Sequence, residues 1–310
     1  MMHVDATSGR RIGRSTHRRG STMNPQLASV FDRLVAETRA VMPDLRFEIL
    51  EIGAVPLGGD AEPFHRLLAD FPGSRIHAFE LDPTSCERLR ALAMPGVEIH
   101  EVAIGRRRER RVVHLTNHPM CSSLYRPNQP WLECFHNLEV SYLRDTAEVS
   151  TVSIDDFTSQ AGIDRIDFVK IDIQGAELDA FQGGSRSLGG CLAIVTEVEF
   201  LELYENQPLF GDVDRELRNQ GFMFHKFLGV AGRAMRPLLM GNDPNAASWH
   251  LWADAMYVRS FEDWSEMELS ALVRLGLLAW LYGSPDITCQ CLMIVDDRLG
   301  TNLLSAMSPD

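Results

Sequence analysis

The chain has 310 residues, of which 45% are hydrophobic and 24% are charged. These proportions are ordinary for a globular protein with a buried core, and they exclude a disordered chain, a fibre and a disulfide-knotted secreted module. Because 43 acidic side chains face 30 basic ones, the formal net charge is −13, and we expect no binding to nucleic acid.

The six cysteines form no CxxC pair and show no metal-site spacing. We interpret them as free thiols of a soluble protein that works in the reducing cytoplasm. The apolar run 275–282 is interrupted by Gly276 and is far shorter than the ~20 residues of a membrane helix. No membrane span is therefore predicted.

Residues 1–22 carry five arginines and one aspartate but no apolar stretch. This pattern predicts a disordered basic leader rather than a secretory signal, with an organelle-targeting or anion-binding arm as the alternative. Residues 23–45 predict an N-terminal helix, since Asn24 and Pro25 suit its first turn and apolar residues then recur at helical spacing.

From residue 46 onwards, apolar strands alternate with helices. The predicted strands cover 47–53, 75–81, 97–104, 110–115, 149–154, 166–173, 192–198, 222–228 and 255–259. Strands this apolar fit a sheet that is covered on both faces, so residues 46–260 predict an α/β domain with a doubly wound, mostly parallel sheet. Residues 116–147 are expected to form a long irregular excursion that carries specificity.

The last segment, 261–310, predicts a small helical appendage. Two helical segments are expected in it, and we predict that this tail forms a homodimer contact.

Candidate binding residues lie at the ends of the first two predicted strands. Glu51, Gly53 and Ala54 close the first strand, where a glycine lets the backbone approach a nucleoside and a carboxylate can accept hydrogen bonds from an ammonium group. Glu80 ends the second strand at a position suited to the hydroxyls of a ribose. No GxGxxG motif follows the first strand, so a pyrophosphate site is not predicted.

A second group of charged residues lies in and after the strand 166–173. Lys170 is one of only two lysines in the chain, and a charge inside an apolar strand is costly unless it is paired. Asp172 stands at the carboxyl end of this strand, where ligands of doubly wound sheets bind. Glu177 falls in the first turn of the next predicted helix, where a carboxylate is favoured by the helix dipole.

In order and spacing, these motifs resemble the FkbM-type S-adenosylmethionine-dependent methyltransferases. The resemblance covers residues 46–260 and is carried by Glu51-Ile-Gly-Ala, Ala78-Phe-Glu-Leu-Asp-Pro, Val102-Ala-Ile-Gly, Val152-Ser-Ile-Asp-Asp-Phe and Ile166-Asp-Phe-Val-Lys-Ile-Asp-Ile-Gln-Gly-Ala-Glu177. The sequence departs from the family's Gly-Ala-Asn-x-Gly turn, because residues 53–57 read Gly-Ala-Val-Pro-Leu.

The resemblance implies a class I, Rossmann-like methyltransferase fold with seven strands and S-adenosylmethionine as methyl donor. It further implies methyl transfer to a hydroxyl oxygen of a sugar or natural product. Carried over position by position, Glu51, Gly53 and Ala54 would face the methionine part of the cofactor. Glu80 and Leu81 would face the ribose, Ala103 the adenine, Ser122 the cofactor surroundings and Asp172 the methyl-transfer end.

A hydroxyl acceptor requires a general base or a metal ion. Asp172 is the first candidate base, with Glu197 and Glu199 as partners, because strand alternation places the two glutamates on one face. The same three carboxylates could bind Mg²⁺. The histidines at 114, 118 and 225 remain alternative bases.

Three other functions stay open at this point. The chain could methylate a nitrogen of a small molecule or peptide, or bind the cofactor as a non-catalytic scaffold. A nicotinamide-dependent oxidoreductase would share the sheet and the ribose carboxylate, but it needs a glycine-rich pyrophosphate turn that is absent from this sequence.

Overall fold

The computed structural model describes residues 25–54, 62–239, 241, 243 and 249–308. The predicted basic leader and the turn 55–61, which includes most of the departure from the family pattern, lie outside the described residues. Among the described helices, none has both the length and the apolar character that crossing a bilayer requires.

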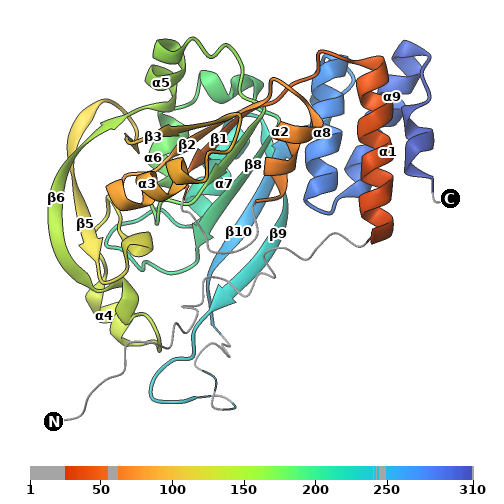
Figure 1. Cartoon of the computed structure of the whole chain (residues 1–310). Helices are drawn as coiled ribbons and strands as arrows, with labels where there is room; N and C mark the ends of the chain where they lie inside the picture. The colour runs from red at the N-terminus through yellow and green to blue at the C-terminus, as the bar shows by residue number, and fades with distance from the viewer. Residues whose placement is uncertain (1–24, 55–61, 240, 242, 244–248, 309–310) are drawn as a thin grey trace.

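A seven-stranded sheet forms the centre of the molecule (Figure 1). Its strand order is β3-β2-β1-β7-β8-β10-β9, and β10 is antiparallel to both of its neighbours while the other pairs are parallel. The strand bounds are β1 Glu48–Ile52, β2 Arg75–Phe79, β3 Val97–His100, β7 Phe168–Ile171, β8 Ala193–Glu199, β9 Phe222–Gly232 and β10 His250–Arg259. The predicted doubly wound, mostly parallel seven-stranded sheet is thus confirmed.

Helices cover both faces of this sheet, as its apolar strands require. One buried cluster joins the sheet to α1 (Pro25–Val41), α2 (Leu67–Asp70), α8 (Leu269–Leu281) and α9 (Pro285–Leu299). The opposite cluster joins it to α5 (Ile154–Ala161), α6 (Glu177–Gln182) and α7 (Phe210–Asn219). Two short helices, α3 (Pro83–Ala91) and α4 (Gln129–Glu133), lie beside the parallel half of the sheet and in the excursion, respectively.

The C-terminal helices lie in the main core rather than on the periphery. In α8 the buried residues run without a break from Leu272 to Leu281, and the hydrophobic ones belong to the same cluster as the sheet residues Ile49 and Phe168. Because α1 packs against the same helical layer (Figure 1), the two ends of the described chain close one face of the sheet together.

A second sheet departs from the sequence-based expectation. It has three strands in the order β4-β6-β5, with bounds β4 Ala103–Ile104, β5 Glu109–Thr116 and β6 Leu143–Val152. The single strand predicted for 97–104 is wrong, since β3 joins the large sheet and β4 the small one. Part of the predicted excursion is also regular, because β6 begins at Leu143 and pairs antiparallel with β5.

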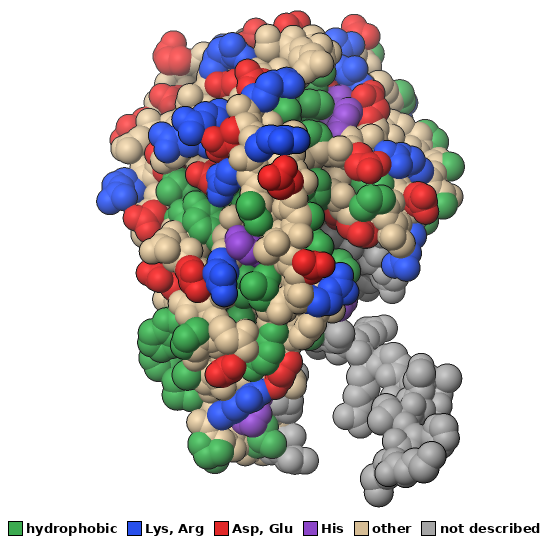
Figure 2. Space-filling model, turned by 90° about the vertical axis from the view of Figure 1, so that its left-hand side faces the viewer, with side chains coloured by type: hydrophobic (Ala, Val, Ile, Leu, Met, Phe, Trp, Pro, Cys, Tyr) green, Lys and Arg blue, Asp and Glu red, His purple; other side chains and the backbone are tan. Residues whose placement is uncertain are grey.

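The outer face of the antiparallel pair β5–β6 carries basic and acidic side chains side by side (Figure 2). The arginine-rich run 106–111 lies here, and Arg107 pairs with Glu109 at 2.9 Å while Arg111 pairs with Asp179 at 3.3 Å. The charge of this run is therefore balanced locally by carboxylates.

Candidate active site

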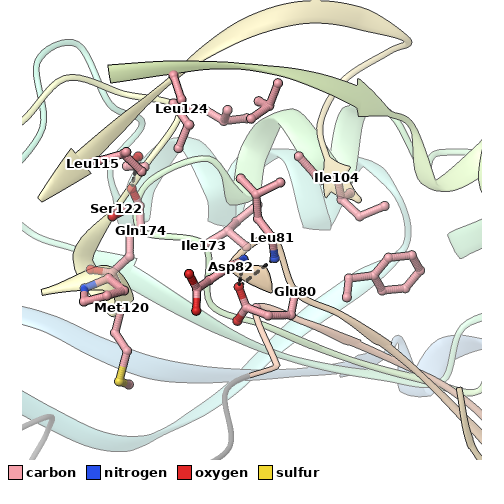
Figure 3. A pocket seen from close by; sticks show the side chains of 18 of the residues that line it. Glu80, Leu81, Asp82, Ile104, Leu115, Met120, Ser122, Leu124, Ile173 and Gln174 are labelled. Carbon is pink, nitrogen blue, oxygen red and sulfur yellow. Dashed lines mark hydrogen bonds between the residues drawn. The ribbon is translucent and has the colours of Figure 1, made fainter. Parts of the chain in front are cut away.

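A cavity of about 400 Å³ opens where β1, β2 and β7 of the large sheet end, and the small sheet lies over it (Figure 3). Its volume falls in the range of ~300–1,000 Å³ that is typical of small-molecule sites. The position is also the expected one, because β1 and β7 are neighbours at the point where the strand order reverses, and ligands of doubly wound sheets bind at such a point.

Glu80 forms part of the cavity wall directly after β2. Its Oε1 accepts hydrogen bonds from the backbone N–H groups of Leu81 and Asp82, at 2.6 and 2.7 Å (Figure 3). Asp82 in turn caps α3, because its carboxylate accepts the N–H of Ser85 at 2.8 Å. The turn therefore fixes the Glu80 carboxylate at the mouth of the cavity.

The middle of the cavity is apolar. Ile104, Leu115, Leu124 and Ile173 line it from the small sheet, the excursion and the end of β7 (Figure 3). Leu115, Leu124 and Ile173 are not predicted from the sequence, because their common wall arises only when β5 pairs with β6 over the large sheet. A cavity with apolar walls and a few polar groups suits a ligand that carries a flat ring and a polar tail.

Gly53 has a structural reason to be glycine. Its φ is +82°, and a Cβ at this position would lie 2.1 Å from the backbone oxygen of Asp172. The close approach that excludes a side chain is therefore made by the end of β7. The sequence had suggested a bound nucleoside as the reason.

Gln174 connects the carboxylates of Asp172 and Glu197. It is a functional candidate that the sequence did not single out. Its Nε2 donates to Asp172 Oδ1 at 2.9 Å and to Glu197 Oε2 at 2.6 Å. Its Oε1 accepts from the Tyr204 hydroxyl at 3.0 Å, and its backbone oxygen accepts from Ser123 Oγ at 2.6 Å. Every polar group of the amide side chain is thus engaged.

The backbone of Gln174 is also unusual. Its φ is +58°, a left-handed conformation that costs free energy for a residue with a Cβ and is rare outside glycine and asparagine. The hydrogen bonds of its side chain and backbone compensate for this cost. The only signal in the sequence is a polar residue directly after the strand that ends in Asp172.

Buried acidic groups surround Asp172. Burial, with Asp172 as a further cause, raises the pKa of Glu177 to about 7, and the Glu177 carboxylate accepts the N–H of Ile173 at 2.7 Å. Burial and the charges of Asp172 and Glu199 raise the pKa of Glu197 well above its usual range. Burial together with Glu177 and Asp172 does the same to the pKa of Glu199. The cluster therefore retains protons near neutral pH.

The predicted site residues divide into two sets. Those that line the cavity are Gly53, Glu80, Leu81, Ala103, Ser122 and Asp172. Those that do not are Glu51, Ala54, Glu197 and Glu199.

The contacts and burial of the second set explain why these residues do not line the cavity. The Glu51 carboxylate lies 3.1 Å from Nε2 of His65, and Ala54 is buried in the core. Glu197 reaches the cavity through Gln174, whereas Glu199 lies deeper, with 3% of its surface exposed.

The aromatic residues in and near the excursion mostly pack against one another. Phe135 is fully buried in a small cluster with Tyr125, Tyr142 and Trp252 at its border. Trp131 and Trp249 remain exposed beside this cluster. A stacking role is therefore confined to these two side chains.

Comparison with known proteins agrees with this geometry. The profile of the methyltransferase FkbM domain matches residues 51–224, which is more than half of the chain. The 2-O-methyltransferase NoeI of Sinorhizobium fredii is 33% identical over 178 residues, which cover 54% of this chain and 69% of NoeI.

Two solved structures are more distant. The methyltransferase FkbM of Methylobacillus flagellatus KT is 14% identical, with a TM-score of 0.38 over 76% of this chain and 58% of the other chain. The magnesium protoporphyrin IX methyltransferase ChlM of Synechocystis PCC 6803, solved with bound SAM, is 11% identical with a TM-score of 0.34 over 76% and 79% of the two chains. On the strength of the match over residues 51–224, the chain belongs to the FkbM methyltransferase family.

Proposed function

We propose that the chain is an S-adenosylmethionine-dependent methyltransferase that methylates a hydroxyl group of a sugar-bearing or other small-molecule acceptor. The observation that carries this proposal is one cavity that is lined both by a fixed carboxylate, Glu80, and by Asp172, which Gln174 links to Glu197. Transfer to oxygen is supported by the relative NoeI, whose name describes a 2-O-methyltransferase.

The lining of the cavity fits the proposed cofactor. Glu80 would bind the ribose hydroxyls, and the apolar wall formed by Ala103, Ile104 and Leu115 would take the adenine. The Asp172 end would then receive the methionine part. When bound, S-adenosylmethionine supplies a methyl group on a sulfonium, which is an activated donor.

The task of the protein is to orient the acceptor and to take its proton. Asp172 lines the cavity and is the proposed base. Gln174 holds the Asp172 carboxylate by its amide, and Lys170 Nζ lies 3.8 Å from Asp172 Oδ2. Glu197, whose pKa is raised by burial and by Asp172, keeps its own proton near neutral pH and is coupled to Asp172 through Gln174.

A magnesium ion bound by Asp172, Glu197 and Glu199 is not supported by this arrangement. The Gln174 amide points a hydrogen-bond donor at both Asp172 and Glu197, whereas a hard cation requires oxygen ligands that converge on one point. We therefore expect activity to persist in EDTA.

Three further features remain proposals. All six cysteines are free, which supports a cytoplasmic location. Trp131 in the excursion and Trp249 directly before β10 are exposed, and an acceptor could stack on them. A homodimer through the helical tail would have to use the outer side of α9, where Met293 and Leu299 are exposed, because α8 is buried.

Radiolabelled methyl transfer tests this proposal. The purified chain is incubated with methyl-labelled S-adenosylmethionine and a panel of glycosides, natural-product alcohols and amines. We expect label in hydroxyl-bearing acceptors, with little in the amines and no loss of rate in EDTA. Label confined to amines would contradict O-methylation, and cofactor binding without label in any acceptor would indicate a scaffold.

A further inference from the structure

A second cluster of ligating side chains lies at the edge of the large sheet, outside the cavity. It consists of His77 on β2 and of Glu98 and His100 on β3, and their ligand atoms all lie within 4.8 Å of one another. The proposed methyl transfer does not use these residues.

Backbone register explains why the three side chains meet. In the parallel pair β2–β3, His77 lies opposite Glu98 and Phe79 lies opposite His100. Side chains two residues apart on a strand share a face, so Glu98 and His100 both project on the side of His77. Phe157 of α5 packs edge-on against both imidazoles and closes the inner side of the cluster.

The distances are those of a ligand set. His77 Nδ1 lies 3.0 Å from His100 Nε2 and 3.6 Å from Glu98 Oε2. Ligand atoms about 2.0–2.1 Å from a tetrahedral Zn²⁺ are about 3.3 Å from each other, which falls between these two values. His77 is 2% exposed while Glu98 is about half exposed, so the cluster has a buried anchor and an open entrance.

A fourth residue fixes the orientation of the buried histidine. Glu48 Oε1 lies 2.6 Å from His77 Nε2, and Glu48 Oε2 accepts from Arg75 at 2.9 Å. Because the Glu48 carboxylate can only accept, the Nε2–H group of His77 donates to it, and the lone pair of Nδ1 is left facing Glu98 and His100.

We propose that His77, Glu98 and His100 form a binding site for a divalent transition-metal ion, with Zn²⁺ as the best fit. Two imidazoles and one carboxylate are the donor set of known open zinc sites, in which water fills the fourth position. Glu48 has the place of the carboxylate that orients a metal-binding histidine from the far side of its ring.

When no metal ion is bound, a hydrogen bond joins the two histidines of this site. Without metal, the His100 Nε2–H group donates to His77 Nδ1, which accounts for the 3.0 Å separation. After a change of tautomer, the neutral imidazole of His100 can present the lone pair of Nε2 to an ion. The ion would replace this hydrogen bond without moving the strands.

The site borders the candidate cofactor site. The N–H of Glu80 donates to the backbone oxygen of His100 at 3.1 Å, and Phe79 packs against the His100 ring. An ion that ties β3 to β2 would therefore stiffen the turn that holds Glu80. We expect it to raise the thermal midpoint of the chain even without cofactor, so this test does not depend on methyl transfer.

The test is a titration of the full chain with Zn²⁺ after removal of metals by a chelator, with Co²⁺ absorption as a second readout of tetrahedral coordination. We expect Glu98→Gln and His100→Gln each to weaken binding at least tenfold and to abolish the thermal shift. Glu48→Gln should weaken it ~10–100-fold. The control is Glu101→Gln, an exposed carboxylate one residue beyond β3, which should bind as the wild type does.

Two results would overturn the site. One is a wild-type chain whose thermal midpoint is unchanged by Zn²⁺, and the other is Zn²⁺ binding that is equally strong in the Glu98 and His100 variants. Since the Glu98 side chain is half exposed, Glu98→Gln keeps the test valid even if a histidine variant does not fold.

Discussion

Gln174 is the residue on which the geometry of the candidate base depends. One amide group donates to two carboxylates, and the strained backbone places it between them. A residue of this kind acts on the reaction through its neighbours, so its removal should affect the chemical step more than cofactor binding.

The variant Gln174→Met tests this role, because methionine has a similar size but lacks the N–H donors. We expect kcat to fall ~10–100-fold, as for the loss of a group that supports general-base catalysis, with little change in the dissociation constant of S-adenosylhomocysteine. The control is Gln220→Met, which changes a partly buried glutamine at the C-terminal end of α7 and should leave kcat unchanged. Equal losses in kcat and in cofactor affinity would argue against a positioning role.

Glu80 should determine cofactor affinity. Replacement by alanine removes a charged hydrogen-bond acceptor, and such bonds contribute about 1.5–3 kcal/mol, so we expect the dissociation constant for S-adenosylhomocysteine to rise ~10–150-fold. Calorimetry measures this change. Glu87→Ala, at an exposed position of α3, should leave the affinity unaltered. An unchanged affinity in Glu80→Ala would remove Glu80 from the site.

Glu177 should make the stability of the chain depend on pH. Its pKa is raised to about 7 in the folded state by burial, so the folded chain binds more protons than the unfolded chain between about pH 4.5 and 7. Stability contributed by this group is therefore present at low pH and is lost as the pH rises through 7.

We expect Glu177→Gln to match the wild type near pH 5 and to be more stable at pH 8, by up to about 3 kcal/mol. Urea unfolding at the two pH values measures the difference. Glu202→Gln, at an exposed position, should show no such divergence. If the stability difference between Glu177→Gln and the wild type is the same at pH 5 and at pH 8, the raised pKa of Glu177 is contradicted.

At the scale of elements, the helical layer formed by α1, α8 and α9 carries part of the core. Leu278 of α8 is fully buried, whereas Leu299 at the end of α9 is 44% exposed. We expect Leu278→Ala to cost ~2–5 kcal/mol and to lower the thermal midpoint by roughly 5–10 °C, with almost no effect of Leu299→Ala. Equal midpoints in the two variants would show that the layer is a dispensable appendage.

The large sheet could be predicted because its strands are short, apolar and separated by helical patterns. The strand β7, for example, is almost wholly apolar and buried on both faces. The small sheet could be predicted only in part. The sequence indicates strands at 110–115 and 149–154, but residues 143–148 of β6 are mostly polar and exposed, and they form a strand by pairing with β5. Because the sequence does not show that these strands form a separate sheet over the cavity, the wall to which Leu115 contributes was not predicted.

The polar residues Glu80 and Asp172 of the cavity could be predicted from the sequence, since they stand in motifs at strand ends. Gln174 was not, because its role depends on a left-handed φ and on partners from β8 and from Tyr204. Such long-range hydrogen bonds leave no periodic pattern. The cluster of His77, Glu98 and His100 was missed for the same reason, since it depends on the register of two strands.

At the scale of the whole molecule, the two sheets meet around a ligand-sized cavity that Asp172 helps to line. The central claim is that this cavity binds S-adenosylmethionine. Calorimetric titration of the wild-type chain with S-adenosylhomocysteine, compared with NADH, tests the claim most directly. We predict saturable binding of one S-adenosylhomocysteine per chain and no heat of binding with NADH. Binding of NADH alone, or of neither compound, would contradict the account.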